Sequence, residues 1–277
     1  MNEVKNPEPK YGTWIRRRKL AWLWLTGFSG IVIAAGLTSL AVLDLSRQLW
    51  LVAVSIGAAG LAVVFSYIAT VVSLTAWRFS PAGGDWQGQV HQLILTRLKP
   101  IDNGIAANQS GLDIGCGSGK LAIQAAAMLP TIQFTGLDFW GDDWEYSAKQ
   151  CQRNAVLEGV ENLDFRPGSA ARLPFADGSF DLVISCLTFH EVQGITDRAV
   201  CLTEAIRVLR LGGQFIFLDL FDDPGFYPDP LAIRLALPAA GAQISESRAL
   251  VDLLALPYPL KGKRALGLGR LICGTKT

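Results

Sequence analysis

The sequence predicts an α/β protein with a mostly parallel sheet, preceded by a transmembrane helical hairpin. Two observations support this prediction. Segments typical of strands and of helices alternate from residue 111 to residue 219, and such alternation indicates a parallel sheet with helices on both faces. Upstream of this region, two long runs without any charged residue cover residues 20–43 and 49–77.

The composition agrees with this division and excludes several classes of protein. The 277 residues are 50% hydrophobic and 18% charged, which is too apolar for a disordered chain. A formal net charge of +1 gives no attraction for a polyanion, so no nucleic-acid partner is expected. The 5 cysteines form no CxxC pair, and with only 2 histidines beside them no metal site is predicted.

Residues 20–43 and 49–77 are each long enough to cross a membrane, because a helix of about 20 apolar residues spans the hydrocarbon layer. One alternative is a pair of buried helices in a soluble domain, but such helices rarely extend so far without a charge. The other is a cleaved signal peptide, whose apolar region of about 7–15 residues is shorter than the first run. Neither run contains an Asp, Glu, Lys, Arg or His residue, which favours an anchor over a transporter.

Basic residues orient the predicted hairpin. Residues 1–19 contain six Lys or Arg and two Glu, whereas the turn between the runs has one basic residue, Arg47. The positive-inside rule then places both termini and the domain that follows in the cytoplasm, as parts of an integral membrane protein. Small residues also recur at spacings that would let the two helices pack closely. They are Gly30, Ala34 and Thr38 in the first run, with Ala53 and Gly57 in the second.

The rest of the chain divides into a connecting segment, residues 78–110, and a domain, residues 111–277. The connecting segment contains a linker at 80–84 and an amphipathic helix predicted over 86–98. Strands of the domain are predicted at 111–114, 133–137, 163–166, 180–186 and 214–219, with two final strands at 249–256 and 270–275. Helices are predicted at 120–128, from Asp142 or Asp143 to Glu158, and from 197 to 209, the last one ending at Gly212 and Gly213.

A glycine-rich loop follows the first predicted strand. Residues 113–119 read DIGCGSG, and glycines at such a loop permit positive φ and let a ligand approach bare backbone. A dinucleotide fingerprint would need glycine at position 120, where the chain has Lys120, so a nicotinamide oxidoreductase is disfavoured. Asp138 ends the second strand, and its carboxylate can accept two hydrogen bonds from a ribose.

Four motifs in this order resemble those of class I S-adenosylmethionine-dependent methyltransferases. The similarity is strongest to the branch with quinone- and sterol-type C-methyltransferases and many small-molecule enzymes. The motifs are LDIGCGSGKL (112–121), FTGLDFW (134–140), RLPFADGSFDLVIS (172–185) and AIRVLRLGGQFIF (205–217). The resemblance implies a Rossmann-like methyltransferase fold with roughly seven strands, and S-adenosyl-L-methionine as the cofactor.

The resemblance also assigns the cofactor contacts. The loop backbone would meet the methionine part, Asp113 would orient the loop and the cofactor amino group, and Asp138 would bind the ribose. The loop residues are Gly115, Cys116, Gly117 and Gly119, and an adenine ring would lie against Phe139 or Trp140. In the family a Gly-Asp-Ala step precedes the LPF motif. Here the step contains Ser169 and Ala170 instead, and Ser185 at the end of the fourth strand completes the predicted contacts.

Two residues are candidates for catalysis. His190 and Glu191 follow the fourth strand, at the edge where open α/β sheets bind ligands. Histidine titrates near neutral pH, but a general base is needed only if the methyl acceptor arrives protonated. The alternative role for His190 is to hold the backbone of this loop.

Two functions of different classes follow. The first is a membrane-anchored methyltransferase that transfers a methyl group to a lipid, a quinone or another small molecule, held at the bilayer by residues 20–77. The second is a membrane-tethered module that binds S-adenosylmethionine or a nucleoside without methyl transfer. The acceptor atom and the oligomeric state stay open at this point.

Overall fold

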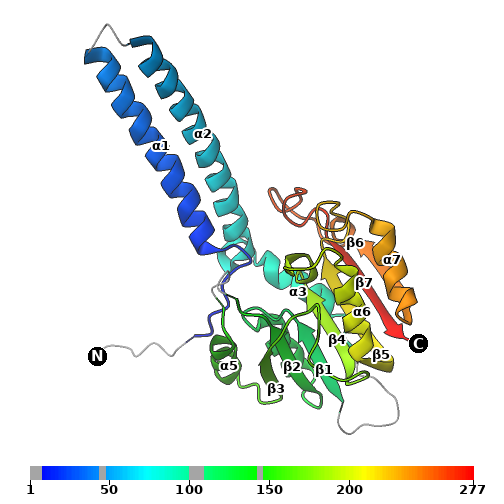
Figure 1. Ribbon diagram of the computed structural model, residues 1–277. Helices are drawn as coiled ribbons and strands as arrows, with labels where there is room; N and C mark the ends of the chain where they lie inside the picture. Colours follow the sequence, from blue (N-terminus) through cyan, green and yellow to red (C-terminus); the bar gives the residue numbers. More distant parts are fainter. Residues whose placement is uncertain (1–7, 44–47, 100–108, 142–145) are drawn as a thin grey trace, which may run out of the picture. The chain divides into compact units, whose positions relative to one another are not determined.

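The computed structural model describes residues 8–43, 48–99, 109–141 and 146–277 (Figure 1). The chain divides into two compact units. The helical unit comprises Thr13–Gln87, and the sheet unit comprises Met1–Gly12 together with Gly88–Thr277. The sheet unit is therefore assembled from chain on both sides of the helical unit.

Two long helices, α1 (Arg17–Leu43) and α2 (Gln48–Phe79), lie side by side in the helical unit (Figure 1). The Ser55 hydroxyl donates to the Ala34 carbonyl at 2.9 Å, and a Cβ added at Gly30 would lie 3.0 Å from the Ala62 Cβ. The small-residue face predicted on α1 therefore contacts α2.

The matching face predicted on α2 is wrong. Ala53 is exposed, and a Cβ added at Gly57 would meet nothing within 4 Å. Ser55, Ala62 and Ala69 are buried instead, at 7%, 2% and 0% exposure. Their spacing of seven residues keeps one face of the helix toward α1, because seven residues make nearly two turns.

Most of the surface of these helices is apolar and uncovered. Both are candidate membrane spans, Arg17–Ala41 with a mean hydropathy of 1.8 and Trp50–Phe79 with 2.2, and only 17% of each is buried. Large side chains such as Phe28, Ile56 and Val63 are 66%, 68% and 69% exposed. A soluble monomer rarely exposes so much contiguous apolar surface, which agrees with the length and composition that make both helices candidate spans.

The sheet unit contains seven strands in the order β3-β2-β1-β4-β5-β7-β6. The first five in this order pair in parallel, and β7 runs antiparallel to both of its neighbours. The predicted mostly parallel sheet of about seven strands is thus confirmed. The strands are β1 (Ser110–Ile114), β2 (Gln133–Asp138), β3 (Leu163–Pro167), β4 (Phe180–Cys186), β5 (Leu209–Asp219), β6 (Ala242–Ala249) and β7 (Arg270–Lys276).

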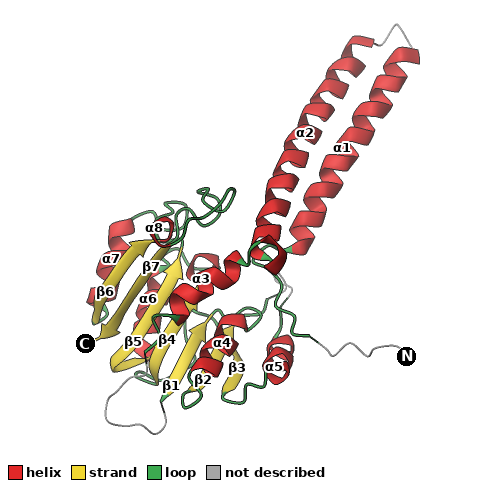
Figure 2. Ribbon diagram, turned by 180° about the vertical axis from the view of Figure 1, so that it is seen from behind, coloured by secondary structure: helices red, strands yellow, loops and turns green. Residues whose placement is uncertain are grey.

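Helices cover both faces of this sheet. Figure 2 shows α3 and α4 on the near face, and Figure 1 shows α6 and α7 on the opposite one. The helices are α3 (Trp86–Leu95), α4 (Lys120–Met128), α5 (Ala148–Leu157), α6 (Ala199–Val208), α7 (Pro230–Ala239) and the short α8 (Leu250–Leu253). Ser147 caps α5 by accepting a hydrogen bond from the Gln150 N–H at 3.2 Å, whereas the predicted caps, Asp142 and Asp143, lie outside the described residues.

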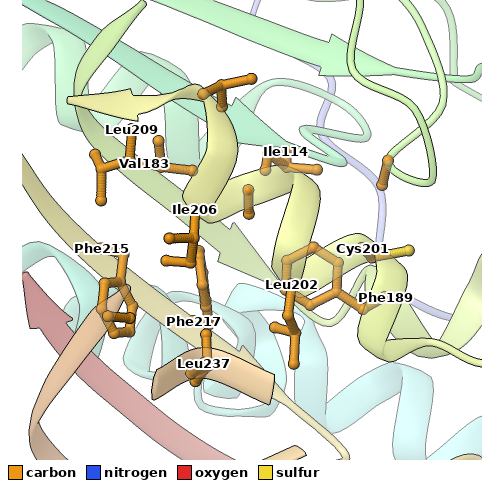
Figure 3. Close-up of a cluster of buried hydrophobic side chains, with 14 of the residues drawn as sticks. Ile114, Val183, Phe189, Cys201, Leu202, Ile206, Leu209, Phe215, Phe217 and Leu237 are labelled. Atoms are coloured by element: carbon orange, nitrogen blue, oxygen red, sulfur yellow. The ribbon is translucent and has the colours of Figure 1, made fainter. Parts of the chain in front are cut away.

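The core between α6 and the sheet fixes the ends of β4 and β5 (Figure 3). Leu202 and Ile206 of α6 lie in one cluster with Val183 of β4 and with Phe215 and Phe217 of β5, and all five are 0% exposed. Burial of each such side chain contributes about 1.5–3 kcal/mol relative to exposure. The carboxyl ends of these strands are therefore rigid supports for the loops that follow.

Two predicted elements near the C-terminus need correction. The strand predicted from Gln214 begins at Leu209, directly after α6, so Gly212 and Gly213 lie inside β5 rather than ending a helix. The β4–β5 register shifts between Phe180 and Leu182, and Gly212 has φ +76, which is typical of a bulge. The strand predicted at 249–256 is wrong, because β6 covers 242–249 and helix α8 follows.

Candidate active site

The loop after β1 folds over the end of β2. The Gly115 and Cys116 N–H groups both donate to the Leu137 carbonyl, at 2.7 and 3.0 Å. Gly115, Gly117 and Gly119 have φ values of +75, +56 and +84, in the region that favours glycine. Helix α4 begins directly after this loop, and its first-turn N–H groups lack helical partners. The predicted glycine loop therefore has the left-handed backbone that glycine permits, directly before the N-terminus of a helix.

Asp138, predicted as the ribose ligand, lies against this loop. Its Oδ2 accepts a hydrogen bond from the Gly117 N–H at 2.8 Å, and its Oδ1 accepts one from the Trp140 N–H at 2.9 Å. A carboxylate offers about four acceptor positions, so both oxygens keep capacity for a further donor. Asp138 can therefore hold the loop and accept hydrogen bonds from the hydroxyls of a ribose at the same time.

Asp113 is a buried acid with one unpartnered oxygen. It is 1% exposed, and its Oδ2 has no hydrogen-bond partner within the described residues. Burial, and then repulsion from Asp138, raise the pKa of Asp113 to about 8, although a backbone hydrogen bond at Ala122 opposes them. A nearby cation would favour the ionised carboxylate. This orphaned oxygen beside a glycine loop thus fits the cationic amino group of S-adenosylmethionine.

Of the two aromatic residues after β2, one is held by a hydrogen bond to the glycine loop and the other is exposed. The Trp140 Nε1–H donates to the Gly117 carbonyl at 2.9 Å, and Trp140 has φ +42, so its indole is fixed to the glycine loop. Phe139 is 75% exposed. Of the two rings predicted to meet adenine, Phe139 is the one that stands free of the loop.

Three other predicted residues serve the scaffold with their side chains. The Ser185 hydroxyl donates to the Ile114 carbonyl at 2.9 Å and is fully buried, which ties β4 to β1. Ala170 belongs to the hydrophobic core. The Ser169 Oγ accepts from the Ala171 N–H at 3.3 Å, so this hydroxyl stabilises its own turn.

Cys116 is not a nucleophile in this environment. Burial, and then a hydrogen bond with Cys151, raise the pKa of the Cys116 thiol well above its ordinary value, so the reactive thiolate is not populated near neutral pH. All five cysteines are buried and free. Within the described residues, no group of three or more His, Cys, Asp or Glu side chains could hold a metal ion.

The loop after β4 contacts the glycine loop. The Thr188 hydroxyl donates to the Gly115 carbonyl at 3.3 Å, and a Cβ at Gly115 would lie 2.1 Å from the Thr188 Cγ2. Leu187 has φ +55, a conformation that is rare for a non-glycine residue and that clusters at functional sites. The loops after β1 and β4 thus meet where the strand order reverses, which is where open α/β sheets bind ligands.

His190 and Asp219 form a buried pair beside this contact. His190 lies in a 3-10 turn, Phe189–Glu191, and its Nδ1 is 2.5 Å from the Asp219 Oδ1. Asp219 also accepts hydrogen bonds from the backbone N–H groups of Phe189, His190 and Leu220, at 2.7, 3.3 and 2.6 Å. With Asp219 as the acceptor of this contact, the neutral His190 ring holds its proton on Nδ1 and has its lone pair on Nε2.

Charged and aromatic groups surround the pair. Burial is the largest influence on the pKa of His190 and lowers it, and the positive charge of Arg198 lowers it further. Attraction to Asp219, the hydrogen bond with Asp219 and attraction to Glu191 together outweigh these two effects, so the pKa of His190 is raised. The Glu191 Oε1 lies 3.6 Å from the His190 Nε2, and the Phe226 ring centroid lies 4.9 Å from that of His190. Tyr227 is 2% exposed, and burial and then Asp219 raise its pKa.

Asp219 and Thr188 were not predicted from the sequence as site residues. Asp219 ends a predicted strand, and in a parallel sheet it lies at the same edge as His190 after the neighbouring strand. The position of Asp219 at this edge was the signal in the sequence that could have predicted its pairing with His190. Thr188 carried no such signal, because its role depends on how close the two loops approach.

Residues 112–217 match the family model of a methyltransferase domain. An O-methyltransferase of Aspergillus nomiae is 35% identical over 119 residues, which cover 43% of this chain and 49% of that protein. A ubiquinone/menaquinone biosynthesis C-methyltransferase of Geotalea daltonii is 34% identical over 122 residues, covering 44% of this chain and 49% of that protein. A crystal structure of a putative S-adenosylmethionine-dependent methyltransferase from Listeria monocytogenes aligns with a TM-score of 0.51 at 16% identity, over 69% of this chain and 98% of that one.

These findings show a methyltransferase domain over residues 112–217. The similarity lies in the region that contains the glycine loop, Asp138 and β4. The chain spans about half the length of the curated relatives it matches, 49% for both of those given above. The structural neighbour supports the fold, and the sequence relatives support the domain.

Proposed function

We propose that this protein is a membrane-anchored methyltransferase that uses S-adenosylmethionine in the cytoplasm. The observation that carries the proposal is the orphaned Asp113 Oδ2 beside the glycine loop, together with Asp138, which accepts a hydrogen bond from the Gly117 N–H of that loop. These groups suit the two ends of the cofactor: a cationic amino group and a ribose with two hydroxyls. The methyltransferase domain spans the same residues.

The bound cofactor would supply a methyl group that leaves a positively charged sulfur for the acceptor atom. The protein's contribution is alignment, and well-oriented reactants gain about 7–11 kcal/mol relative to free collision. The loops that provide this alignment, after β1 and β4, are joined by the hydrogen bond from Thr188 to Gly115.

His190 is the general base of the proposal when the acceptor is a hydroxyl. Its Nε2 would take the hydroxyl proton, and Asp219 would stabilise the resulting imidazolium through Nδ1–H. The 2.5 Å contact between the two side chains supports this role. Glu191, the other residue predicted from the sequence, is more exposed and lies 3.6 Å from the same nitrogen, so it modulates His190 and is not the base.

The proposed acceptor is a lipid or an isoprenoid quinone. Two candidate spans with uncovered apolar surfaces support attachment to a bilayer, and an anchored domain meets acceptors that are themselves confined to the membrane. One similar protein is named for ubiquinone and menaquinone biosynthesis. Six basic residues before the spans favour a cytoplasmic domain.

A tethered module that binds the cofactor without methyl transfer is the second candidate. The observation in its favour is Ser169, which replaces the family's acid and whose hydroxyl is engaged with the Ala171 N–H. Weaker adenine recognition would suit a sensor. The buried pair of His190 and Asp219 favours the methyltransferase over this module, because it provides a candidate general base.

The test uses the full chain in lipid nanodiscs with methyl-labelled S-adenosylmethionine. Lipid extract and soluble metabolites are supplied in separate reactions, and Asp138→Asn, which weakens the ribose site, is the negative control. Label in the lipid fraction supports the proposal, whereas label only in soluble products overturns the lipid acceptor. Binding without transfer to either pool would favour the module, and no binding by calorimetry would refute both functions.

A further inference from the structure

Residues 8–12, which precede the first apolar helix, dock on α5 within the sheet unit. The Lys10 N–H donates to the Asn154 Oδ1 at 2.8 Å, and the Lys10 carbonyl accepts from the Asn154 Nδ2 at 2.9 Å. The same carbonyl accepts from the Gln150 Nε2 at 2.5 Å, and the Tyr11 hydroxyl bonds the Glu158 Oε1 at 3.0 Å. We call residues 8–12 the strap. Gln150, Asn154 and Glu158 are four residues apart, so one face of α5 receives it.

Asn154 connects the strap to the glycine loop. Its side chain is 1% exposed, and its Nδ2 donates to the Ser118 carbonyl at 3.1 Å in addition to the Lys10 carbonyl. One turn earlier on the same helix, the Cys151 thiol donates to the Gly117 carbonyl at 3.2 Å. Movement of the strap would therefore leave a buried amide with unmet hydrogen bonds directly beside the loop.

Tyr146 provides a second connection. A Cβ at Gly12 would lie 3.3 Å from the Tyr146 Cε1, and a Cβ at Gly117 would lie 3.7 Å from the same ring. The ring thus lies next to the end of the strap and next to the middle of the glycine loop. Gly12 has φ +67, which glycine adopts without strain.

We propose that the strap is part of the cofactor site, with Asn154 as its positioning residue. It fixes the backbone of residues 117 and 118, so that the loop is already ordered when the ligand arrives and binding orders fewer residues. The proposal rests on the proposed function, because it takes the glycine loop to be the cofactor loop. Since the strap acts through the loop and not on the reacting atoms, its loss would weaken cofactor binding more than it slows turnover.

The strap also constrains the topology of the chain. Residues 8–12 precede α1 and residues 88–277 follow α2, yet both belong to the sheet unit. If α1 and α2 cross a bilayer, both ends of the helical unit must therefore emerge on the same side. Cleavage after a signal sequence would remove the strap, so the proposal requires an N-terminus that is retained.

The experiment compares two substitutions at one position in the full chain in nanodiscs. Lys10→Pro removes the N–H that Asn154 accepts, whereas Lys10→Ala keeps the backbone and is the matched control. Calorimetry with S-adenosylmethionine should give a Kd about two- to tenfold higher for Lys10→Pro, the range that one neutral hydrogen bond contributes. Lys10→Ala should bind like the wild type. Deletion of residues 2–12, which keeps the basic residues 16–19, should raise Kd by about tenfold or more.

Hydrogen exchange of residues 115–121 without ligand is the second measurement. The deletion and Lys10→Pro should both exchange faster there than the wild type and Lys10→Ala. A folded deletion variant with unchanged Kd overturns the inference, as does a lower Tm with unchanged Kd and loop exchange, because the strap would then only stabilise the fold. A wild-type protein that does not bind S-adenosylmethionine refutes the proposed function instead, so the two failures are distinct.

Discussion

At the scale of single residues, Asp113 should link cofactor binding to a proton. The pKa of about 8 in the free protein means that this carboxyl is mostly protonated at pH 7. A bound cation would stabilise the carboxylate, so binding should release up to about one proton. Calorimetry at pH 7.0 in buffers of different ionisation enthalpy measures that number. Asp113→Asn should release none and should bind more weakly.

The same group makes the free protein less stable in alkali. Its folded-state pKa exceeds the ordinary value of 3.8, so the folded state holds the proton more tightly, and stability falls as pH rises from about 4 through 8. Asp113→Asn removes that loss. If the variant and the wild type lost equal stability between pH 6 and pH 8.5, the raised pKa would be contradicted.

His190 should give the reaction an acidic limb. Its Nε2 accepts a proton only in the neutral ring, and Asp219 raises the pKa of that ring, so kcat should fall as pH drops through a value above 6.5. His190→Gln should lower kcat by about 100- to 10,000-fold, as for the loss of a general base, with little change in cofactor Kd. Glu191→Gln is the control and should stay near the wild-type rate. A purely structural histidine would instead change Tm and leave the pH profile in place.

The stability contributed by the His190–Asp219 pair changes with pH in the direction opposite to kcat: it falls as pH rises. Because the folded-state pKa of His190 is raised, the contribution is complete below the ordinary pKa and is lost as pH rises through the folded value. The form needed for catalysis is thus the one in which the pair contributes least. This opposition is expected of a group placed for chemistry and not for stability.

At the scale of elements, the contact between the loops after β1 and β4 depends on glycine at position 115. Gly115→Ala would place a Cβ 2.1 Å from the Thr188 side chain at φ +75. Gly194→Ala is a close control, since Gly194 has φ +76 and nothing within 4 Å. Both variants have similar backbone strain, of order 1 kcal/mol, but only Gly115→Ala should separate the loops. Calorimetry should show a Kd for S-adenosylmethionine raised by about tenfold or more for Gly115→Ala and nearly unchanged for Gly194→Ala.

The elements that the sequence predicted well have local signals. Helix α4 spans Lys120–Met128 and strand β4 spans Phe180–Cys186, both as predicted, because glycine or proline bounds the helix and an apolar run defines the strand. Strand β6 was missed since its residues alternate between partly buried and exposed, which gives little hydrophobic signal at the edge of a sheet. Gly212 and Gly213 were misread because a bulge and a helix end use the same residue type.

The site was predictable as far as it follows single strand ends. Asp113 and Asp138 stand near the carboxyl ends of neighbouring strands, where the motifs predicted them, and the structure shows in addition that Asp138 accepts a hydrogen bond from the glycine loop. The strap could not be predicted, because its hydrogen bonds use the Lys10 backbone. No side-chain pattern encodes a contact between backbone and an asparagine 144 residues away.

At the scale of the whole molecule, the two units give a direct test of topology. All five native cysteines are buried, so a single cysteine introduced at the surface reports its own side of the membrane. We expect Glu8→Cys and Thr277→Cys to react with a membrane-impermeant maleimide in inside-out vesicles and to be protected in right-side-out ones. A cysteine placed between α1 and α2 should show the reverse pattern.

The same vesicles test the anchor itself. Apolar surface of the kind exposed on Phe28, Ile56 and Val63 would hold the protein in the membrane through an alkaline carbonate wash, since two spans bind far more tightly than a surface charge. Release by carbonate would contradict the hairpin. Labelling of positions 8 and 277 from opposite sides would be more damaging, because a strap across the bilayer from α5 could not donate its Lys10 N–H to Asn154. The two results together decide whether residues 8–12, which precede the first helix, lie on the same side of the membrane as the sheet unit.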